Sequence, residues 1–278
     1  MNLNWFETIL YGLFSGLSDI LPVSAQAHRT LLLKVFGARG SGDLLELLIH
    51  LAIIAALYSG CRSTIVRMNR ARRLALVPKK KRKRPLDVKS MMDMRMLRTM
   101  MIPGIIGLLM FRKASGIREN LIAVAFWLFV NGLILYIPQY LPSGNKDCRN
   151  LSRVEGLLMG LGGGVSVIPG ISAVGSITSV GSVCSVDGSY CLELALLSNL
   201  MLNMGYGIYD VLGLVQNGLG TISAMILVQY IAAAAAAYGA AWLAIRVMRH
   251  LAQERNYSIF GFYCFGLSLF VFILNLIA

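Results

Sequence analysis

The fold of this chain is decided by two short segments, Leu21-Pro22-Val23-Ser24-Ala25 and Ile168-Pro169-Gly170-Ile171-Ser172-Ala173. Each segment interrupts an apolar stretch at a proline, a residue that ends or kinks a helix. The two prolines stand 147 residues apart in a chain of 278 residues. Interrupted hydrophobic segments at matching positions in two halves indicate an internal repeat, with a binding site where the interruptions meet.

The composition of the chain indicates a lipid environment. Apolar residues make up 56% of the sequence, charged residues only 14%, and the mean hydropathy is +0.67. Ordinary soluble domains contain about 25% charged residues. A soluble fold with so few charged residues would expose large apolar patches. We therefore expect an all-α integral membrane protein, a polytopic helical bundle with inverted repeats and two re-entrant helix pairs broken near Pro22 and Pro169.

One membrane domain is expected over residues 1–278, with a first repeat over about residues 1–140 and a second over about residues 151–278. Nearly all of the +13 net charge falls in residues 62–98, which hold 14 Lys and Arg against two acids. Between two apolar stretches, this pattern predicts a cytoplasmic loop that contacts anionic phospholipids. A role as a topology determinant alone explains the loop equally well, and its confinement argues against nucleic-acid binding.

Polar side chains gather around the two breaks and on the helix that follows the first, where membrane burial makes them costly. Glu46 and His50 are spaced i, i+4, so they share a helix face and can form a hydrogen bond. Such groups suit a phosphate or a polar lipid head group, although packing explains any single serine. The substrate-binding candidates are Ser15, Ser24, Gln26, His28, Gly170, Ser172, Ser176, Glu46 and His50. No metal-binding motif is present in the sequence.

At both breaks the sequence resembles the bacterial undecaprenyl-diphosphate phosphatase family. The first family motif, E-G-L-T-E-F-L-P-[VI]-S-S-[TS]-G-H, corresponds to residues 15–28, and the second, P-G-x-S-R-S-G-x-T, to residues 169–177. Similar segments at residues 46–51, 102–107 and 260–263 extend the resemblance over nearly the whole chain. The resemblance implies a multi-pass protein of the bacterial plasma membrane and a polyprenyl phosphate lipid as partner. It also implies hydrolysis by the motif residues, aided by a divalent cation such as Mg or Ca.

The departures from the family motifs fall on the residues that would carry the chemistry. The first motif glutamate is Ser15, the second is shortened to Asp19, the second serine is Ala25, and the motif-two arginine is Ala173. Losing that arginine removes a bidentate phosphate clamp. The pattern therefore indicates a preserved scaffold with an eroded catalytic site.

Three functions follow from these observations. The first is a protein that binds, and moves across the membrane, undecaprenyl phosphate or diphosphate in cell-wall lipid-carrier recycling. The second is an active phosphatase in which Asp19, Ser24 and His28 carry the catalysis. The third is a regulatory membrane partner that acts through the basic loop. The sequence leaves a homodimer open.

Overall fold

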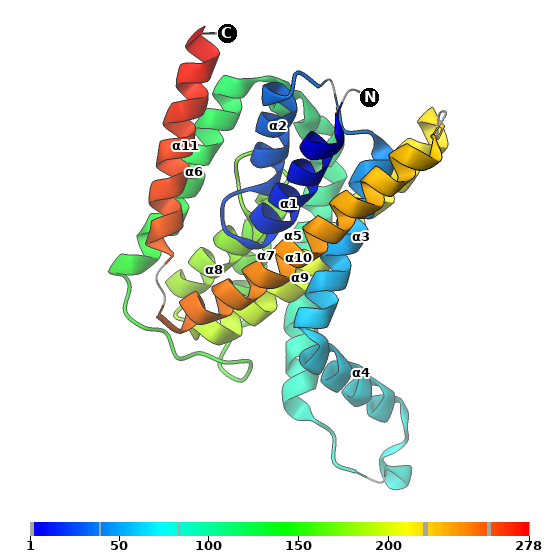
Figure 1. Cartoon of the computed structure of the whole chain (residues 1–278). Coiled ribbons are helices and arrows are strands. Elements are labelled where there is room, and N and C mark those ends of the chain that lie inside the picture. Colours follow the sequence, from blue (N-terminus) through cyan, green and yellow to red (C-terminus); the bar gives the residue numbers. More distant parts are fainter. Residues whose placement is uncertain (1–2, 39, 83, 219–221, 255–256, 278) are drawn as a thin grey trace.

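The chain is a bundle of helices, shown in Figure 1 as a computed structural model that describes residues 3–38, 40–82, 84–218, 222–254 and 257–277. Within these ranges there is no β-strand. The α-helices are α1 (Trp5–Ile20), α2 (Ala25–Val35), α3 (Asp43–Gly60), α4 (Arg62–Leu76), α5 (Val88–Glu119), α6 (Leu121–Tyr136), α7 (Arg153–Val165), α8 (Ala173–Val183), α9 (Gly188–Asn217), α10 (Ala224–Glu254) and α11 (Ser258–Ile277).

Six of the described helical segments are long and apolar enough to cross a membrane. A crossing needs about 20 apolar residues. The segments are Asp43–Gly60, Val88–Phe111, Leu121–Tyr140, Gly188–Asn217, Ala224–Ala252 and Ser258–Leu276. The predicted polytopic helical membrane fold is thereby confirmed.

Both predicted breaks are helix ends. Helix α1 ends at Ile20, two residues before Pro22, and α2 begins after it, while α7 ends at Val165, four residues before Pro169, and α8 follows. The residue before a proline is disfavoured in the helical conformation, which favours an end for each helix near these positions. Ser24 and Ser172 then cap the next helix, because each hydroxyl oxygen accepts a hydrogen bond from a first-turn N–H group. These four helices have 16, 11, 13 and 11 residues, too few for a full crossing.

The two breaks pack against each other at the centre of the bundle. The Ser24 hydroxyl oxygen accepts a hydrogen bond from the Gly170 backbone N–H at 3.0 Å. Gly170 has a φ of +115°, and a Cβ there would lie 2.5 Å from the Trp127 side chain. Only glycine fits this left-handed backbone in so little space. The sequence therefore places a glycine where the second break approaches α6.

The helices of the two halves pack reciprocally. Helix α1 packs on α10, as α7 packs on α5, while α3 packs on α9 and α6 on α11. Gly12 and Gly16 of α1 lie directly against the backbone of Ala233 and Ala237 of α10, a small-residue contact typical of membrane helices. Reciprocal pairing of this kind supports the predicted repeat, whose boundaries stay a prediction.

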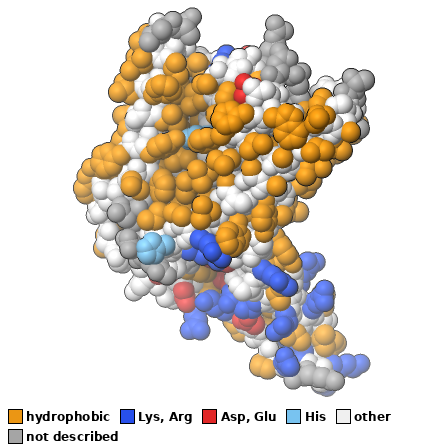
Figure 2. Space-filling model, in the orientation of Figure 1, with side chains coloured by type: hydrophobic (Ala, Val, Ile, Leu, Met, Phe, Trp, Pro, Cys, Tyr) orange, Lys and Arg blue, Asp and Glu red, His pale blue; other side chains and the backbone are white. Residues whose placement is uncertain are grey.

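The basic segment 62–98, expected to be a loop, is largely helical. Helix α4 and the first turns of α5 form an arm that extends below the bundle in Figure 1. Residues 62–76 contain no proline or glycine and several good helix formers, which favours a helix there. Arg67 of α4 contacts Asp93 of α5 at 3.3 Å and joins the two. Figure 2 shows basic side chains over this arm and apolar side chains over the bundle.

Candidate functional site

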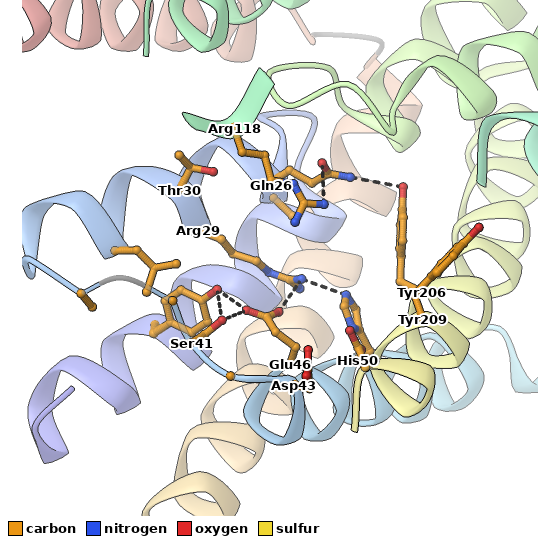
Figure 3. Close-up of a pocket in the computed structure, with 18 of the residues that line it drawn as sticks. Gln26, Arg29, Thr30, Ser41, Asp43, Glu46, His50, Arg118, Tyr206 and Tyr209 are labelled. Carbon is orange, nitrogen blue, oxygen red and sulfur yellow. Dashed lines mark hydrogen bonds and ion pairs between the residues drawn. The ribbon is translucent and has the colours of Figure 1, made fainter. Parts of the chain in front are cut away.

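A pocket of about 950 Å³ opens beside the first break, along one side of α2. Its walls come from α1, α2, the connection to α3, α3, the end of α5 and the second half of α9. Figure 3 shows the side chains that point into it. Residues 165–173 of the second break are not part of this wall. The pocket thus lies to one side of the point where the breaks meet.

A chain of polar contacts crosses the floor of the pocket. Arg29 of α2 contacts Glu46 of α3 through Nη1 at 3.1 Å and donates from the same nitrogen to His50 Nε2 at 2.8 Å. His50 Nδ1 lies 2.6 Å from an Asp210 carboxylate oxygen. A guanidinium group can only donate, so His50 must accept at Nε2 and carry its proton at Nδ1, where it donates to Asp210. These contacts fix the His50 tautomer and the direction of Arg29.

Glu46 is held by more than its ion pair. The hydroxyl groups of Tyr11 and Ser41 both donate to one of its oxygens, while Arg29 contacts the other. The side chain of Glu46 is only 19% exposed and that of Arg29 only 11%. A buried carboxylate needs several donors to remain charged. The arrangement is therefore a charged network in which Glu46 orients Arg29.

A second group of contacts forms the opposite wall, where Arg118 enters from the end of α5. Its Nη2 donates to Gln26 Oε1 at 3.3 Å, and its guanidinium carbon lies 4.4 Å above the centre of the Phe111 ring. The Gln26 amide in turn donates to the Tyr206 hydroxyl at 3.3 Å. Tyr206 also stacks on His50, with ring centres 5.7 Å apart. The two walls are linked through this tyrosine.

Four of the residues predicted to form the site do line this pocket. They are Asp19, Gln26, Glu46 and His50. One oxygen of Asp19 accepts hydrogen bonds from the side-chain amides of Asn199, at 2.7 Å, and Asn203, at 3.0 Å. The structure thus brings together parts of α1, α2, α3 and α9 that lie as far as 184 residues apart in the sequence.

The other predicted residues lie outside the pocket wall. Ser24, Gly170 and Ser172 are used in the contacts of the breaks, where the Ser172 N–H donates to Asn131 at 2.9 Å. His28 is buried on another face of α2, with Nδ1 at 2.8 Å from the Ser24 carbonyl oxygen and Nε2 at 2.7 Å from the Tyr263 hydroxyl. Their functional roles stay predictions.

The remaining two predicted residues, Ser15 and Ser176, are buried in α1 and α8. Their hydroxyl oxygens have no hydrogen-bond partner within the part of the chain that the structure describes. Neither residue lines the pocket. A direct contact between these serines and a molecule in the pocket is thus not supported by their placement.

Sequence reasoning missed Arg118 and Tyr206. Arg118 stands between apolar segments near other basic residues, which is typical of a charge at a helix end. Tyr206 lies in a long apolar helix, where an aromatic residue usually indicates packing. The hydrogen bond between the side chains of Arg118 and Gln26 joins positions 92 residues apart. Only the tertiary fold brings them to one pocket, so no local pattern could reveal them.

The divalent cation implied by the resemblance does not match the side chains of this pocket. Glu46 is surrounded by donors, and Asp19 faces two amide groups and not another carboxylate. Among the described residues, no three acidic, histidine or cysteine side chains form a cluster suited to a metal ion. Hard divalent cations prefer several oxygen ligands. The side chains of the pocket therefore suit an anion better than a divalent cation.

The fold and the pocket define a polytopic helical membrane protein with a charged, partly buried binding site between its helices. The family model described as bacitracin resistance protein BacA matches residues 8–270, and the chain belongs to this family. It is therefore a multi-pass protein of the plasma membrane.

Curated relatives carry the name undecaprenyl-diphosphatase. The protein from Methanobrevibacter smithii is 27% identical over 271 residues, covering 96% of each chain. The proteins from Halothermothrix orenii and Shouchella clausii are 23% and 24% identical, covering at least 95% of each chain. The similarity is low but extends from end to end, so the resemblance to this family inferred from the two motifs is confirmed.

Proposed function

We propose that this protein binds undecaprenyl phosphate or diphosphate in the pocket, and carries it across the membrane in cell-wall lipid-carrier recycling, without hydrolysing it. The observation that carries the proposal is the placement of Ser24 and His28, the two catalytic candidates of the first motif that are unchanged. Ser24 and His28 are occupied in structural hydrogen bonds outside the pocket, whereas a charged pocket remains beside them.

The loss of catalysis follows from the chemistry that hydrolysis requires. A nucleophile or an activated water must lie within hydrogen-bond reach of a base, and donors must stabilise the developing charge. Asp19 is the motif carboxylate left in the pocket, and both amides that contact it donate to it. The Ser24 oxygen already accepts from two backbone N–H groups. Among the described residues, no hydrogen bond joins the side chain of Asp19 or Ser24 to a second acidic, histidine or hydroxyl group.

Transport is supported by the two broken helix pairs. Broken helices that meet within an inverted repeat are a recurring architecture of secondary transporters. A fluorescent polyprenyl phosphate in proteoliposomes tests this part, since a membrane-impermeant quencher reports movement between leaflets. We expect faster quenching with the protein than with empty liposomes. Equal rates would refute transport while leaving binding intact.

An active phosphatase is the second candidate, and the names of the curated relatives favour it. In this case Asp19 would act with a water molecule in the pocket. Release of phosphate from undecaprenyl diphosphate distinguishes the two functions, because a carrier binds the lipid and releases nothing. A homodimer stays open.

We further propose that the arm formed by α4 and the start of α5 contacts anionic phospholipids. Arg70, Arg72 and Arg73 are exposed on α4, and each basic residue near an anionic surface contributes about 1 kcal/mol. The triple variant with glutamine at these positions should lose enrichment of anionic lipid in nanodiscs of mixed composition. Unchanged enrichment would indicate that the arm determines topology alone. A lipid-independent loss of function in this variant would favour the regulatory function.

A further inference from the structure

The carboxylates that line the pocket already have donors. Glu46 accepts from Arg29, Tyr11 and Ser41, and Asp210 accepts from His50. In addition, Asp19 is held by Asn199 and Asn203, and Asp43 by Asn217. Glu119, the fifth, is exposed at the pocket edge. The acidic lining is therefore largely satisfied from within the protein.

The arginines of the pocket, in contrast, have N–H donors without acceptors. Arg29 uses Nη1 for Glu46 and His50, but its Nε and Nη2 are buried without a hydrogen-bond partner in the described part of the chain. Arg118 uses Nη2 for Gln26, and its Nε is also buried and unpartnered there. Buried N–H donors that lack an acceptor are unfavourable. The pocket thus has surplus donors that an acceptor-rich ligand would satisfy.

The positions of these donors match an anion with several oxygens. In Arg29, the unpartnered Nε and Nη2 form one edge of the guanidinium group, the edge that binds carboxylate or phosphate oxygens in pairs, whereas Arg118 offers Nε beside the Nη2 that Gln26 uses. Arg118 carries no ion pair among the described residues. Figure 3 shows both side chains reaching into the same pocket from different helices. An anion between them would accept hydrogen bonds from both guanidinium groups.

We propose that Arg29 and Arg118 together hold the phosphate group of a phosphate monoester or diphosphate in this pocket, in place of the motif-two arginine that is Ala173 here. The inference rests on the proposed function and assigns the residues that recognise the ligand. Arg29 is the oriented member, fixed by Glu46 and His50. Arg118 is the adaptable member, held by the neutral amide of Gln26 and the Phe111 ring.

The test is ligand binding by the full-length protein in nanodiscs, with three probes: undecaprenyl phosphate, undecaprenol and inorganic phosphate. The variants are Arg118→Gln, Arg29→Gln and Arg118→Lys. The matched control is Arg249→Gln, because Arg249 also contacts an acid, Glu193, but lies outside the pocket. Arg118→Gln is the decisive variant, since it removes no ion partner from a buried acid. Thermal unfolding and gel filtration verify that each variant is folded.

We expect undecaprenyl phosphate to bind more tightly than undecaprenol. Arg118→Gln should weaken its binding by about tenfold or more, because a hydrogen bond between charged groups is lost. Arg29→Gln should weaken it further, Arg118→Lys should restore part of it, and Arg249→Gln should leave it unchanged. Competition by inorganic phosphate, with the same dependence on both arginines, would support the arginine pair and assign a soluble phosphate as the ligand.

Two results would overturn the inference, and they have different consequences for the proposed function. If undecaprenyl phosphate binds better than undecaprenol but both folded glutamine variants bind it as the wild type does, the arginine pair is wrong and the proposed function stands. If the wild type binds undecaprenol as well as undecaprenyl phosphate, phosphate recognition is absent, and the proposed function fails with the inference.

Discussion

Replacement of Glu46 by alanine tests whether the charged network of the pocket is as tightly coupled as its geometry indicates. The change leaves the Arg29 guanidinium without its counter-charge and removes the acceptor of Tyr11 and Ser41. Loss of one partner from a buried ion pair costs about 3–5 kcal/mol. The side chains are 11% and 19% exposed and face an open pocket, so we expect the lower end, about 3 kcal/mol.

The assay is thermal unfolding of the purified protein in detergent. A change of 1 kcal/mol shifts the Tm by about 2–4 °C in chains of comparable size, so the expected drop is about 6–12 °C. The control is Glu193→Ala, which breaks a more exposed ion pair with Arg249 and should cost less than about 1 kcal/mol. Adding Arg29→Met to Glu46→Ala should restore part of the loss, because no buried charge is then left unpaired. A drop no larger than that of the control, or strictly additive losses, would refute the reasoning.

Three further predictions concern the scaffold. Gly16→Val should lower the Tm strongly, because its side chain would enter the backbone of α10, whereas Gly239→Ala, where the added Cβ meets open space, should be neutral in the same scan. Ser24→Ala should cost about 1–3 kcal/mol in unfolding experiments, since it leaves a buried N–H of the second break without an acceptor; no change would show that the hydroxyl does not hold the breaks together. The Lys146 ammonium and the α7 cap hold the pKa of Glu155 below its ordinary value, so the stability they contribute is present above the unfolded pKa, about 4.3, and is lost as the pH falls through the folded pKa. Lys146→Met should flatten this acid dependence of the Tm, and an unchanged profile would contradict it.

The fold could be predicted because its main determinants are local. Hydropathy marks the membrane helices, and a proline disfavours the helical conformation of the residue before it, which favours a helix end near Pro22 and Pro169. The helical arm was missed because a high density of charge was interpreted as a loop. Helix propensity and the contact between Arg67 and Asp93 favour the helix there instead.

The site could be predicted only in part, for a geometric reason. Successive residues of a helix point about 100° apart, so Gln26 and Arg29 of α2 face the pocket while His28 faces Tyr263. A polar residue in an apolar segment is costly to bury, which indicates a functional role. The sequence does not indicate on which face of the helix its side chain lies. Arg118 reaches the pocket from a distant helix, and that placement depends on tertiary packing alone.

Phosphate release from undecaprenyl diphosphate by the purified wild-type protein decides whether this protein hydrolyses the lipid or only binds it. It is measured with and without added Mg or Ca, beside an Asp19→Ala/His28→Ala variant. A curated relative named undecaprenyl-diphosphatase serves as the positive control. We expect release no greater than that of the variant, from wild-type protein that binds undecaprenyl phosphate in preference to undecaprenol. Turnover that is present in the wild type and vanishes in the variant would contradict this expectation and identify a working phosphatase.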